Sequence, residues 1–231
     1  MTLEGVRLVT VDLDDTVWPC RPAIEQAERK LFEWLERRAP RIAVHHDVQS
    51  LREHRKQLIR ERPEIAHDLT RVRREHLRRL FGDYGYDAAI VEEGVILFRH
   101  ERNQVQPYAD VQPALVRLRA RVILVSMTNG NAQVEHTPLR GLFHHELDAA
   151  TVGAAKPHPA MFEAALRIGG VEARHAVHVG DDPERDIEAA RLAGLRGVWV
   201  NRNGLAWPED LPPPEATLTT FKGLDEVLIA G

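Results

Sequence analysis

The residue types that could carry out chemistry lie in four short polar segments spread over the 231-residue chain. In chain order the segments contain Asp12 and Asp14, then Thr128 and Asn129, then Lys156, and finally Asp181, Asp182 and Asp186. Carboxylates contributed by different segments form the oxygen ligand set that Mg²⁺ prefers. A lysine, a threonine hydroxyl and loop N–H groups suit the oxygens of a phosphoryl group. We expect the four segments to meet in one site for Mg²⁺ and a phosphate ester.

Asp12 and Asp14 are the residues that we expect to react. A carboxylate held in line with phosphorus can attack it and form an acyl phosphate. A second carboxylate two residues later can donate a proton to the leaving oxygen and then take one from the attacking water. Taken alone, the same acidic stretch would suit a turn that caps the next element together with Thr16. The assignment therefore depends on the other three segments.

Apolar runs precede most of these polar segments and have the composition of buried strands. The strands are expected within Val6–Thr16, Arg121–Met127, Leu142–Val152, His175–Val179, Arg196–Val200 and Ala216–Leu228. Helical patterns separate them, and this alternation predicts an α/β fold with a Rossmann-like parallel sheet and right-handed crossovers. Ligands bind at the carboxyl ends of the strands in such a sheet, which is where the polar segments are expected.

A long helical insert interrupts this alternation directly after the first strand. Apolar residues recur at spacings of three and four from Ala23 to Arg38, and no strand is evident between Trp18 and Gln106. We therefore predict a core domain of residues 1–18 and 107–231 and an α-helical domain of residues 19–106. Its Arg-rich segment Leu51–Leu80 forms a solvated helix face, or turns one or two arginines inward to meet an anionic or planar substrate.

The composition excludes several classes of protein. A net charge of −4 argues against general affinity for nucleic acid. No apolar run approaches the roughly 20 residues needed to cross a membrane, and no export signal is visible. A single cysteine, Cys20, rules out an internal disulfide and fits a reducing compartment. We expect a cytoplasmic protein, a monomer or weak homodimer, with a small-molecule phosphate ester as its partner.

The four polar segments, taken in order, resemble a known set of motifs. DLDDT, TNG, AAKPHP and GDDPERD are similar to motifs one to four of the haloacid dehalogenase (HAD) superfamily of phosphatases. The resemblance covers Val6–Thr16 and about Pro107–Val200, and the set of four is far more specific than any one motif. The helical insert resembles the C1 cap domain of the superfamily, which closes over the site and selects the substrate.

The resemblance implies a role for each residue. Asp12 would be the nucleophile and Asp14 the general acid and base, while Asp12, Asp181 and the backbone carbonyl of Asp14 would bind Mg²⁺. Thr128, with Asn129 in the same loop, and Lys156 would hold the phosphoryl group; Ser126 is a rival for the hydroxyl, but it lies inside the apolar run. Asp182 or Asp186 would support the metal site and pair with Lys156. The implied activity is that of a phosphoric monoester hydrolase.

Three other functions are weighed against this one. In the dehalogenases that gave the superfamily its name the residue two positions after the nucleophile is not acidic, so Asp14 favours phosphate ester hydrolysis over cleavage of a carbon–halogen bond. A phospho-accepting receiver domain also uses an aspartate, Mg²⁺, a threonine and a lysine, but it has no helical insert of this size. A non-catalytic binding module would be expected to lack at least one motif.

A finer resemblance concerns the substrate. The segments Pro63–Arg74 and Thr128–Gln133 are similar to bacterial phosphatases that act on flavin mononucleotide and on 5-amino-6-(5-phospho-D-ribitylamino)uracil. If this holds, Arg71, Arg74 or His67 would contact the ring or the ribityl chain. Trp18 would stack on a planar group of the substrate or pack in the core.

Overall fold

The computed structural model describes residues 3–228, and the chain in it divides into two compact units. One unit, here called the core unit, consists of Met1–Pro19 and Val105–Gly231, and the other, the helical unit, is Cys20–Gln104. No helix in the described part of the chain has both the length and the apolar character needed to span a bilayer.

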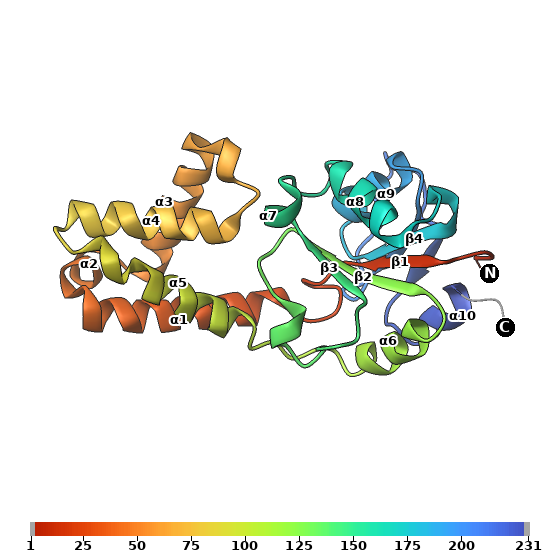
Figure 1. Cartoon of the computed structure of the whole chain (residues 1–231), viewed down its shortest axis with the longest axis horizontal. Helices are drawn as coiled ribbons and strands as arrows, with labels where there is room; N and C mark the ends of the chain where they lie inside the picture. The colour runs from red at the N-terminus through yellow and green to blue at the C-terminus, as the bar shows by residue number, and fades with distance from the viewer. Residues whose placement is uncertain (1–2, 229–231) are drawn as a thin grey trace. The chain divides into compact units, whose positions relative to one another are not determined.

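The core unit is built on a six-stranded parallel sheet with the strand order β3-β2-β1-β4-β5-β6 (Figure 1). The strands are β1 (Leu8–Val11), β2 (Ile123–Thr128), β3 (His145–Asp148), β4 (Ala176–Gly180), β5 (Arg196–Val200) and β6 (Ala216–Leu218). All four residues of β1 are buried, because helices cover both faces of the sheet. The structure thus confirms the predicted Rossmann-like parallel sheet.

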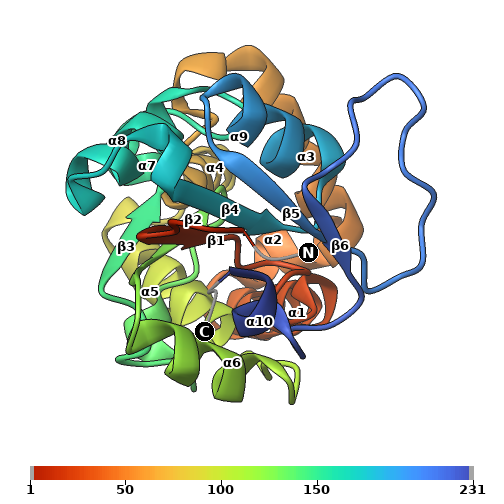
Figure 2. The same ribbon diagram turned by 90° about the vertical axis from the view of Figure 1, so that its right-hand side faces the viewer.

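Two groups of helices cover the sheet, as Figure 2 shows: α7, α8 and α9 lie over one face, and α6 and α10 lie over the other. Their bounds are α6 (Val111–Arg119), α7 (Ala149–Val152), α8 (Ala160–Gly169), α9 (Ala189–Leu192) and α10 (Leu224–Leu228). Short 3₁₀ turns, η3 (Val134–His136) and η4 (Ala173–His175), complete the connections. The core beneath α8 joins Leu8 of β1, Met127 of β2 and Phe162 of α8.

The register of the central strands places the polar segments side by side. β1 lies between β2 and β4, with Val11 opposite both Ser126 and Val179. The residues that follow these strands therefore emerge together at the carboxyl edge of the sheet. This is the edge where ligands bind in open parallel sheets.

Two helices of the core unit begin after a turn of another kind. The helix α6 begins at Val111 after a turn, in which the Val111 N–H donates to the Tyr108 carbonyl at 3.0 Å and the Tyr108 N–H donates to the Val17 carbonyl at 3.0 Å. The helix α9 is directly preceded by a π-helical turn, η5 (Pro183–Glu188). This wider turn brings Asp186 back to accept a hydrogen bond from the Asp182 N–H at 3.1 Å.

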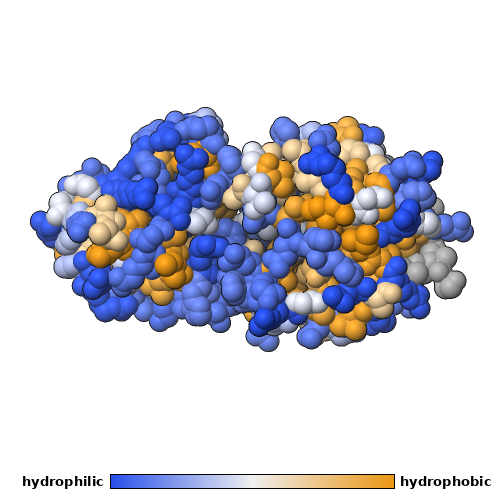
Figure 3. All heavy atoms as spheres, viewed as in Figure 1, coloured by the Kyte–Doolittle hydropathy of each residue, from blue (hydrophilic) through white to orange (hydrophobic). Residues whose placement is uncertain are grey.

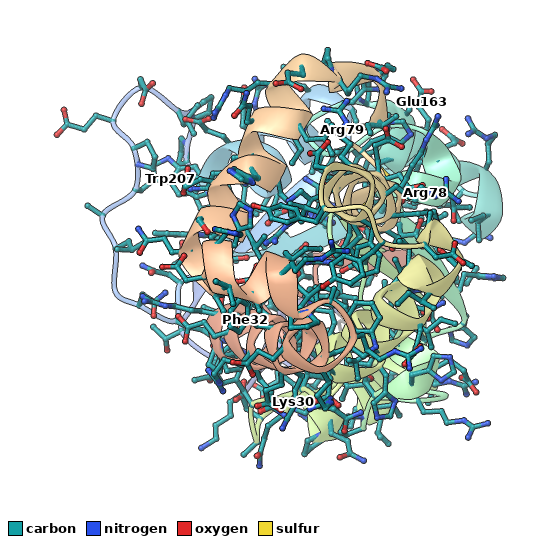
Figure 4. The ribbon with its side chains drawn as sticks, turned by 90° about the vertical axis from the view of Figure 1, so that its left-hand side faces the viewer. Lys30, Phe32, Arg78, Arg79, Glu163 and Trp207 are labelled. Carbon is teal, nitrogen blue, oxygen red and sulfur yellow. The ribbon has the colours of Figure 1, made fainter. Side chains whose placement is uncertain are left out.

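The helical unit contains no strand. It consists of α1 (Cys20–Arg38), α2 (Pro40–His45), α3 (Val48–Glu61), α4 (Leu69–Asp83) and α5 (Val91–Arg102), with the 3₁₀ turns η1 (Pro63–Ile65) and η2 (Ala88–Ile90). Trp34 of α1 packs closely on Gly94 of α5, where an added Cβ would lie 2.8 Å from the indole ring. The face seen in Figure 3 is largely hydrophilic over this unit, and Arg78 and Arg79 extend from exposed positions of α4 (Figure 4).

Candidate active site

Asp12 directly follows β1 and lies at the centre of the carboxyl edge. Its N–H donates to the Val179 carbonyl at 2.8 Å, which continues the pairing of β1 with β4 by one residue. Its side chain is 90 % buried, and carboxylates are rarely so buried unless they are paired. The partner is Lys156, whose Nζ donates to Asp12 Oδ1 at 2.6 Å.

Lys156 connects β2 with the segments that follow β1 and β4 through one buried ammonium group. Besides Asp12, its Nζ donates to Asp186 Oδ1 at 2.7 Å and to the Met127 carbonyl at 3.0 Å. The three protons of the ammonium group therefore all have acceptors. Although burial lowers the pKa of Lys156, the carboxylates of Asp12 and Asp186 raise it above its ordinary value. Lys156 is accordingly charged at neutral pH.

Asn129 fixes the backbone of Lys156. Its side-chain amide donates to the Lys156 carbonyl at 2.8 Å and accepts from the Lys156 N–H at 2.7 Å. Nearby, the buried Thr128 accepts a hydrogen bond from the Gly130 N–H through Oγ1 at 2.9 Å, and Ser126 is buried within β2. Contact of Thr128, Asn129 or Lys156 with a phosphoryl group stays a prediction.

Three carboxylates meet next to Lys156. Asp12, Asp181 and Asp186 each offer an oxygen, and these oxygens all lie within 4.8 Å of one another. Thr16, which is wholly buried, bridges two of them, since its Oγ1 lies 3.1 Å from Asp12 Oδ2 and 2.9 Å from Asp181 Oδ1. A compact set of carboxylate oxygens fits a hard divalent cation such as Mg²⁺.

The electrostatics of these carboxylates also fit a cation. Burial, with the neighbouring Asp186, raises the pKa of Asp181 to about 7. Burial likewise raises the pKa of Asp12 well above its ordinary value, against the effect of Lys156. Asp186 differs, because Lys156 and His178 outweigh burial and lower its pKa. One lysine therefore does not neutralise the negative charge that three carboxylates would place here.

Asp186, rather than Asp182, is the partner of Lys156. The Asp182 carboxylate caps η5 and accepts hydrogen bonds from the N–H groups of Glu184 and Arg185 at 3.0 and 2.8 Å. Asp186 packs against Gly180, where an added Cβ would lie only 2.3 Å from its Oδ2. The chain therefore requires a glycine at the end of β4 for Asp186 to reach the site.

Sequence reasoning missed the buried His178 in β4. Its Nε2 lies 3.1 Å from Asp186 Oδ1, and its Nδ1 lies 2.7 Å from the hydroxyl of Thr10 in β1. Burial lowers the pKa of His178, so its imidazole is neutral and supports Asp186 by donating from Nε2. The signal in the sequence is a histidine inside an apolar strand just before an acidic turn.

The structure also places the side chains about which the sequence left a choice. Trp18 is fully buried in the core unit, so the idea that it stacks on a substrate is wrong; its Nε1 donates to Asp14 Oδ1 at 2.9 Å. In the helical unit, Arg74 forms hydrogen bonds to both carboxylate oxygens of Glu92, at 2.5 and 3.1 Å. A role for Arg71, Arg74 or His67 in substrate binding stays a prediction.

Comparison with known proteins gives three kinds of match. Residues 6–194 match the family model for haloacid dehalogenase-like hydrolases. The chain is 32% identical over 205 residues to the 5-amino-6-(5-phospho-D-ribitylamino)uracil phosphatase YigB of Escherichia coli, covering 86% of this chain and 84% of the relative. It is 40% identical over 140 residues to a phosphoserine phosphatase of Thermus thermophilus, covering 58% and 54% of the two chains.

Among solved structures, a 2-haloacid dehalogenase from Pseudomonas syringae pv. Tomato superposes with a TM-score of 0.90 and 41% identity, covering 96% of this chain and 97% of the other. A HAD phosphatase from Thermococcus onnurineus gives a TM-score of 0.69 at 25% identity. The similar proteins thus include enzymes named as phosphatases and enzymes named as dehalogenases.

Proposed function

Because the chain belongs to the haloacid dehalogenase-like hydrolase family, we propose that it is a Mg²⁺-dependent phosphatase that hydrolyses a small-molecule phosphate monoester. The observation that carries this proposal is the arrangement around Asp12. Its carboxylate is hydrogen-bonded to Lys156 and lies within a group of three acidic side chains at the carboxyl edge of the sheet. The enzyme would act through an aspartyl phosphate.

In the first step, a carboxylate oxygen of Asp12 forms a bond to phosphorus while the bond from phosphorus to the leaving oxygen breaks. The leaving oxygen takes that electron pair and a proton from Asp14. In the second step, a water oxygen attacks phosphorus, Asp14 takes a proton from the water, and the bond to Asp12 breaks. The products are the alcohol and inorganic phosphate, and both carboxyl groups return to their starting states.

Lys156 and Thr128 would hold the phosphoryl group during both steps. The Lys156 ammonium is fixed by Asp186 and the Met127 carbonyl, so it needs little reorganisation to stabilise charge as the reaction proceeds. Asp12, Asp181 and the backbone carbonyl of Asp14 would hold Mg²⁺. The metal would neutralise part of the negative charge on the phosphoryl oxygens.

A 2-haloacid dehalogenase is the second candidate, and the 41% identical solved structure favours it. A halide leaves without a proton, whereas an alkoxide leaving group needs one, and the carboxyl group of Asp14, two residues after Asp12, is of a type that can supply it. Asp14 therefore favours phosphatase activity over dehalogenase activity. Release of chloride from 2-chloropropionate at a rate exceeding phosphate release from every ester would reverse the preference.

The test of the reaction class uses the full chain with p-nitrophenyl phosphate. We expect phosphate release that requires Mg²⁺, disappears with EDTA and returns when Mg²⁺ is added in excess. Asp12→Asn should lower kcat by at least about a thousandfold while the circular dichroism spectrum stays unchanged, because an amide cannot replace the attacking carboxylate. Full activity in EDTA, or in the Asp12→Asn variant, would contradict the proposal.

For the substrate, we propose flavin mononucleotide or a riboflavin-pathway ribityl phosphate. The YigB relative, which is named for the second of these compounds, supports the choice. We also propose that the helical unit serves as the cap that selects the substrate. A screen of phosphorylated metabolites that includes both compounds, compared by kcat/KM, tests the choice; a kcat/KM for another class of ester that is tenfold higher would contradict it.

A further inference from the structure

The turn that follows Asp12 holds the side chain of Asp14 against a buried indole. Trp18 Nε1 donates to Asp14 Oδ1 at 2.9 Å, and Trp18 has no exposed surface. The indole nitrogen is a donor only, so the direction of this hydrogen bond is certain. Asp14 itself is only half-buried. One end of the contact is therefore buried in the core, and the other is partly exposed.

The backbone of this turn is fixed by hydrogen bonds at several points. The Asp15 N–H donates to the Trp18 carbonyl at 2.8 Å, and Asp15 adopts a left-handed conformation with φ of 62°. This folds the chain back so that residue 18 lies beside Asp14, with which it forms a β-bridge. The left-handed conformation is less favourable for a non-glycine residue, and such strained residues are common at functional sites.

The turn is also tied to the rest of the core unit. The Val17 carbonyl accepts from the Tyr108 N–H at 3.0 Å, and the Thr16 carbonyl accepts from Arg202 Nε at 2.8 Å. Arg202 is in turn held by Asp110, at 3.0 Å between Nη2 and Oδ2. The turn that carries Trp18 is therefore held by hydrogen bonds to other parts of the core unit.

We propose that Trp18 is a positioning residue for proton transfer, which orients the Asp14 carboxyl group through its indole N–H. The inference rests on the proposed function, in which Asp14 gives its proton to the leaving oxygen. A carbonyl-type oxygen accepts hydrogen bonds better than the oxygen of a C–O–H group. Donation to Oδ1 therefore favours the proton on Oδ2, and it fixes the plane in which that proton is presented.

The test compares esters whose leaving groups need the proton to different degrees. The readout is kcat/KM, because it covers the steps up to departure of the leaving group and excludes hydrolysis of the aspartyl phosphate. For Trp18→Phe we expect kcat/KM to fall by about tenfold or more for glycerol 2-phosphate, a poor leaving group. For 2,4-dinitrophenyl phosphate, whose leaving group departs as an anion, we expect a fall of less than about threefold.

Trp34→Phe is the matched control. Trp34 is buried in the helical unit, and its Nε1 donates to a carboxylate oxygen of Glu93 at 2.9 Å, so the substitution removes the same kind of hydrogen bond. We expect this variant to treat the two esters alike. If Trp18→Phe fails to fold, replacing Trp18 by 3-(3-benzothienyl)alanine keeps the shape of the ring and removes only the N–H group.

Asp14→Asn separates failure of this inference from failure of the proposed function. If Asp14→Asn discriminates between the two esters and the Trp18 variants do not, the role of Trp18 is overturned and the phosphatase mechanism stands. If Asp14→Asn lowers kcat/KM equally for both esters, acid catalysis by Asp14 is overturned, and the inference with it. An equal deficit for both esters in the Trp18 variants would mean that the indole serves only packing.

Discussion

The two units each bury an ion cluster, and the two clusters have opposite compositions. In the core cluster, one ammonium group faces three carboxylates: Lys156 with Asp12, Asp181 and Asp186. In the helical cluster, one carboxylate faces three guanidinium groups: Glu28 with Arg52, Arg55 and Arg73. In each cluster, a single residue carries the charge that is opposite to that of the other three.

The clusters differ in how their excess charge is accommodated. In the helical cluster the Arg52 side chain is 40% exposed, and the Arg73 guanidinium lies over the Phe98 ring at 3.2 Å from its centroid. Water and an aromatic face can therefore stabilise the extra positive charge. The Lys156 and Asp186 side chains of the core cluster are each only 2% exposed.

The two clusters differ in the sign of the charge that burial disfavours. In the core unit, burial raises the pKa of Asp12 and of Asp181, so the cost of bringing the carboxylates together is not fully offset by the protein itself. A bound cation would offset it, as the proposed Mg²⁺ site requires. The helical cluster carries a cost of the same kind, since burial lowers the pKa of Arg73 and its Nε and Nη1 have no hydrogen-bond partner in the described chain. Its excess charge is positive, however, so a cation cannot offset it.

The largest expected effect comes from removing the central cation of the core cluster. Lys156→Met should lower the free energy of unfolding in EDTA by about 3–5 kcal/mol, since it leaves buried carboxylates without their partner. It should also lower kcat for p-nitrophenyl phosphate by at least about a hundredfold, through loss of the charge that stabilises the phosphoryl group. Urea denaturation and steady-state kinetics measure the two effects.

The control for this variant is Lys30→Met. Lys30 pairs with Glu33 at 3.0 Å on an exposed face of α1 (Figure 4), and an exposed pair contributes about 0–1 kcal/mol. A Lys156→Met variant as stable as the Lys30→Met variant would mean that the core cluster is not held together by its lysine.

The core cluster was largely predictable from the sequence, and the helical cluster was not. Asp12, Lys156 and Asp181 follow apolar strands or lie in the following loop, and a parallel sheet brings such positions to one edge. Thr16 was considered only as part of a capping turn, and His178 was missed, because a buried hydroxyl or imidazole looks like any other polar residue in a strand or turn.

Glu28 illustrates a further limit. It lies three residues before Leu31 and seven before Leu35, on the buried face of α1, and that spacing was a usable signal of burial. Its partners were not predictable, because nine arginines lie between Leu51 and Leu80 and the packing of α3 and α4 decides which of them turn inward. Arg55 and Arg73 do so and meet Glu28 and Phe98, respectively.

The second prediction asks whether each cluster can be replaced by apolar residues. Replacing a buried ion pair by apolar side chains of similar volume is often neutral or stabilising, whereas removing one partner is costly. Glu28→Gln should therefore lower the free energy of unfolding by about 2–3 kcal/mol. The double variant Glu28→Leu with Arg55→Met should recover most of this loss and keep kcat for p-nitrophenyl phosphate within about threefold.

The same design in the core cluster should separate stability from function. Lys156→Met combined with Asp186→Leu should recover stability in the same way, but its activity should remain lost. Denaturant unfolding and hydrogen exchange of α1 and α3 measure the stability of the Glu28 variants. Denaturant unfolding and steady-state kinetics together measure the core variants. Recovery of activity in the core double variant would remove the distinction between the clusters.

The smallest expected effect concerns acid, and it arises in α4 beside the helical cluster. His76 is buried, and its Nε2 has no hydrogen-bond partner in the described chain. Burial, with the charges of Arg55 and Arg73, lowers the pKa of His76 to about 2. A histidine in an unfolded chain has a pKa near 6.5. Below that pH, His76 therefore binds a proton in the unfolded chain but stays neutral in the folded chain. The contribution of His76 to stability is therefore complete above pH 6.5 and decreases as the pH falls below that value.

Between pH 7 and pH 5 this linkage should reduce the free energy of unfolding of the helical unit by about 2 kcal/mol. In His76→Leu, which cannot take up the proton, that part of the loss should disappear, whereas the exposed His100→Leu should behave as the parent chain does. Hydrogen exchange of the α4 amides at the two pH values, compared with amides of β1, reports on each unit separately. Equal acid sensitivity of α4 in the parent and in His76→Leu would show that the burial of His76 is not what makes the helical unit sensitive to acid.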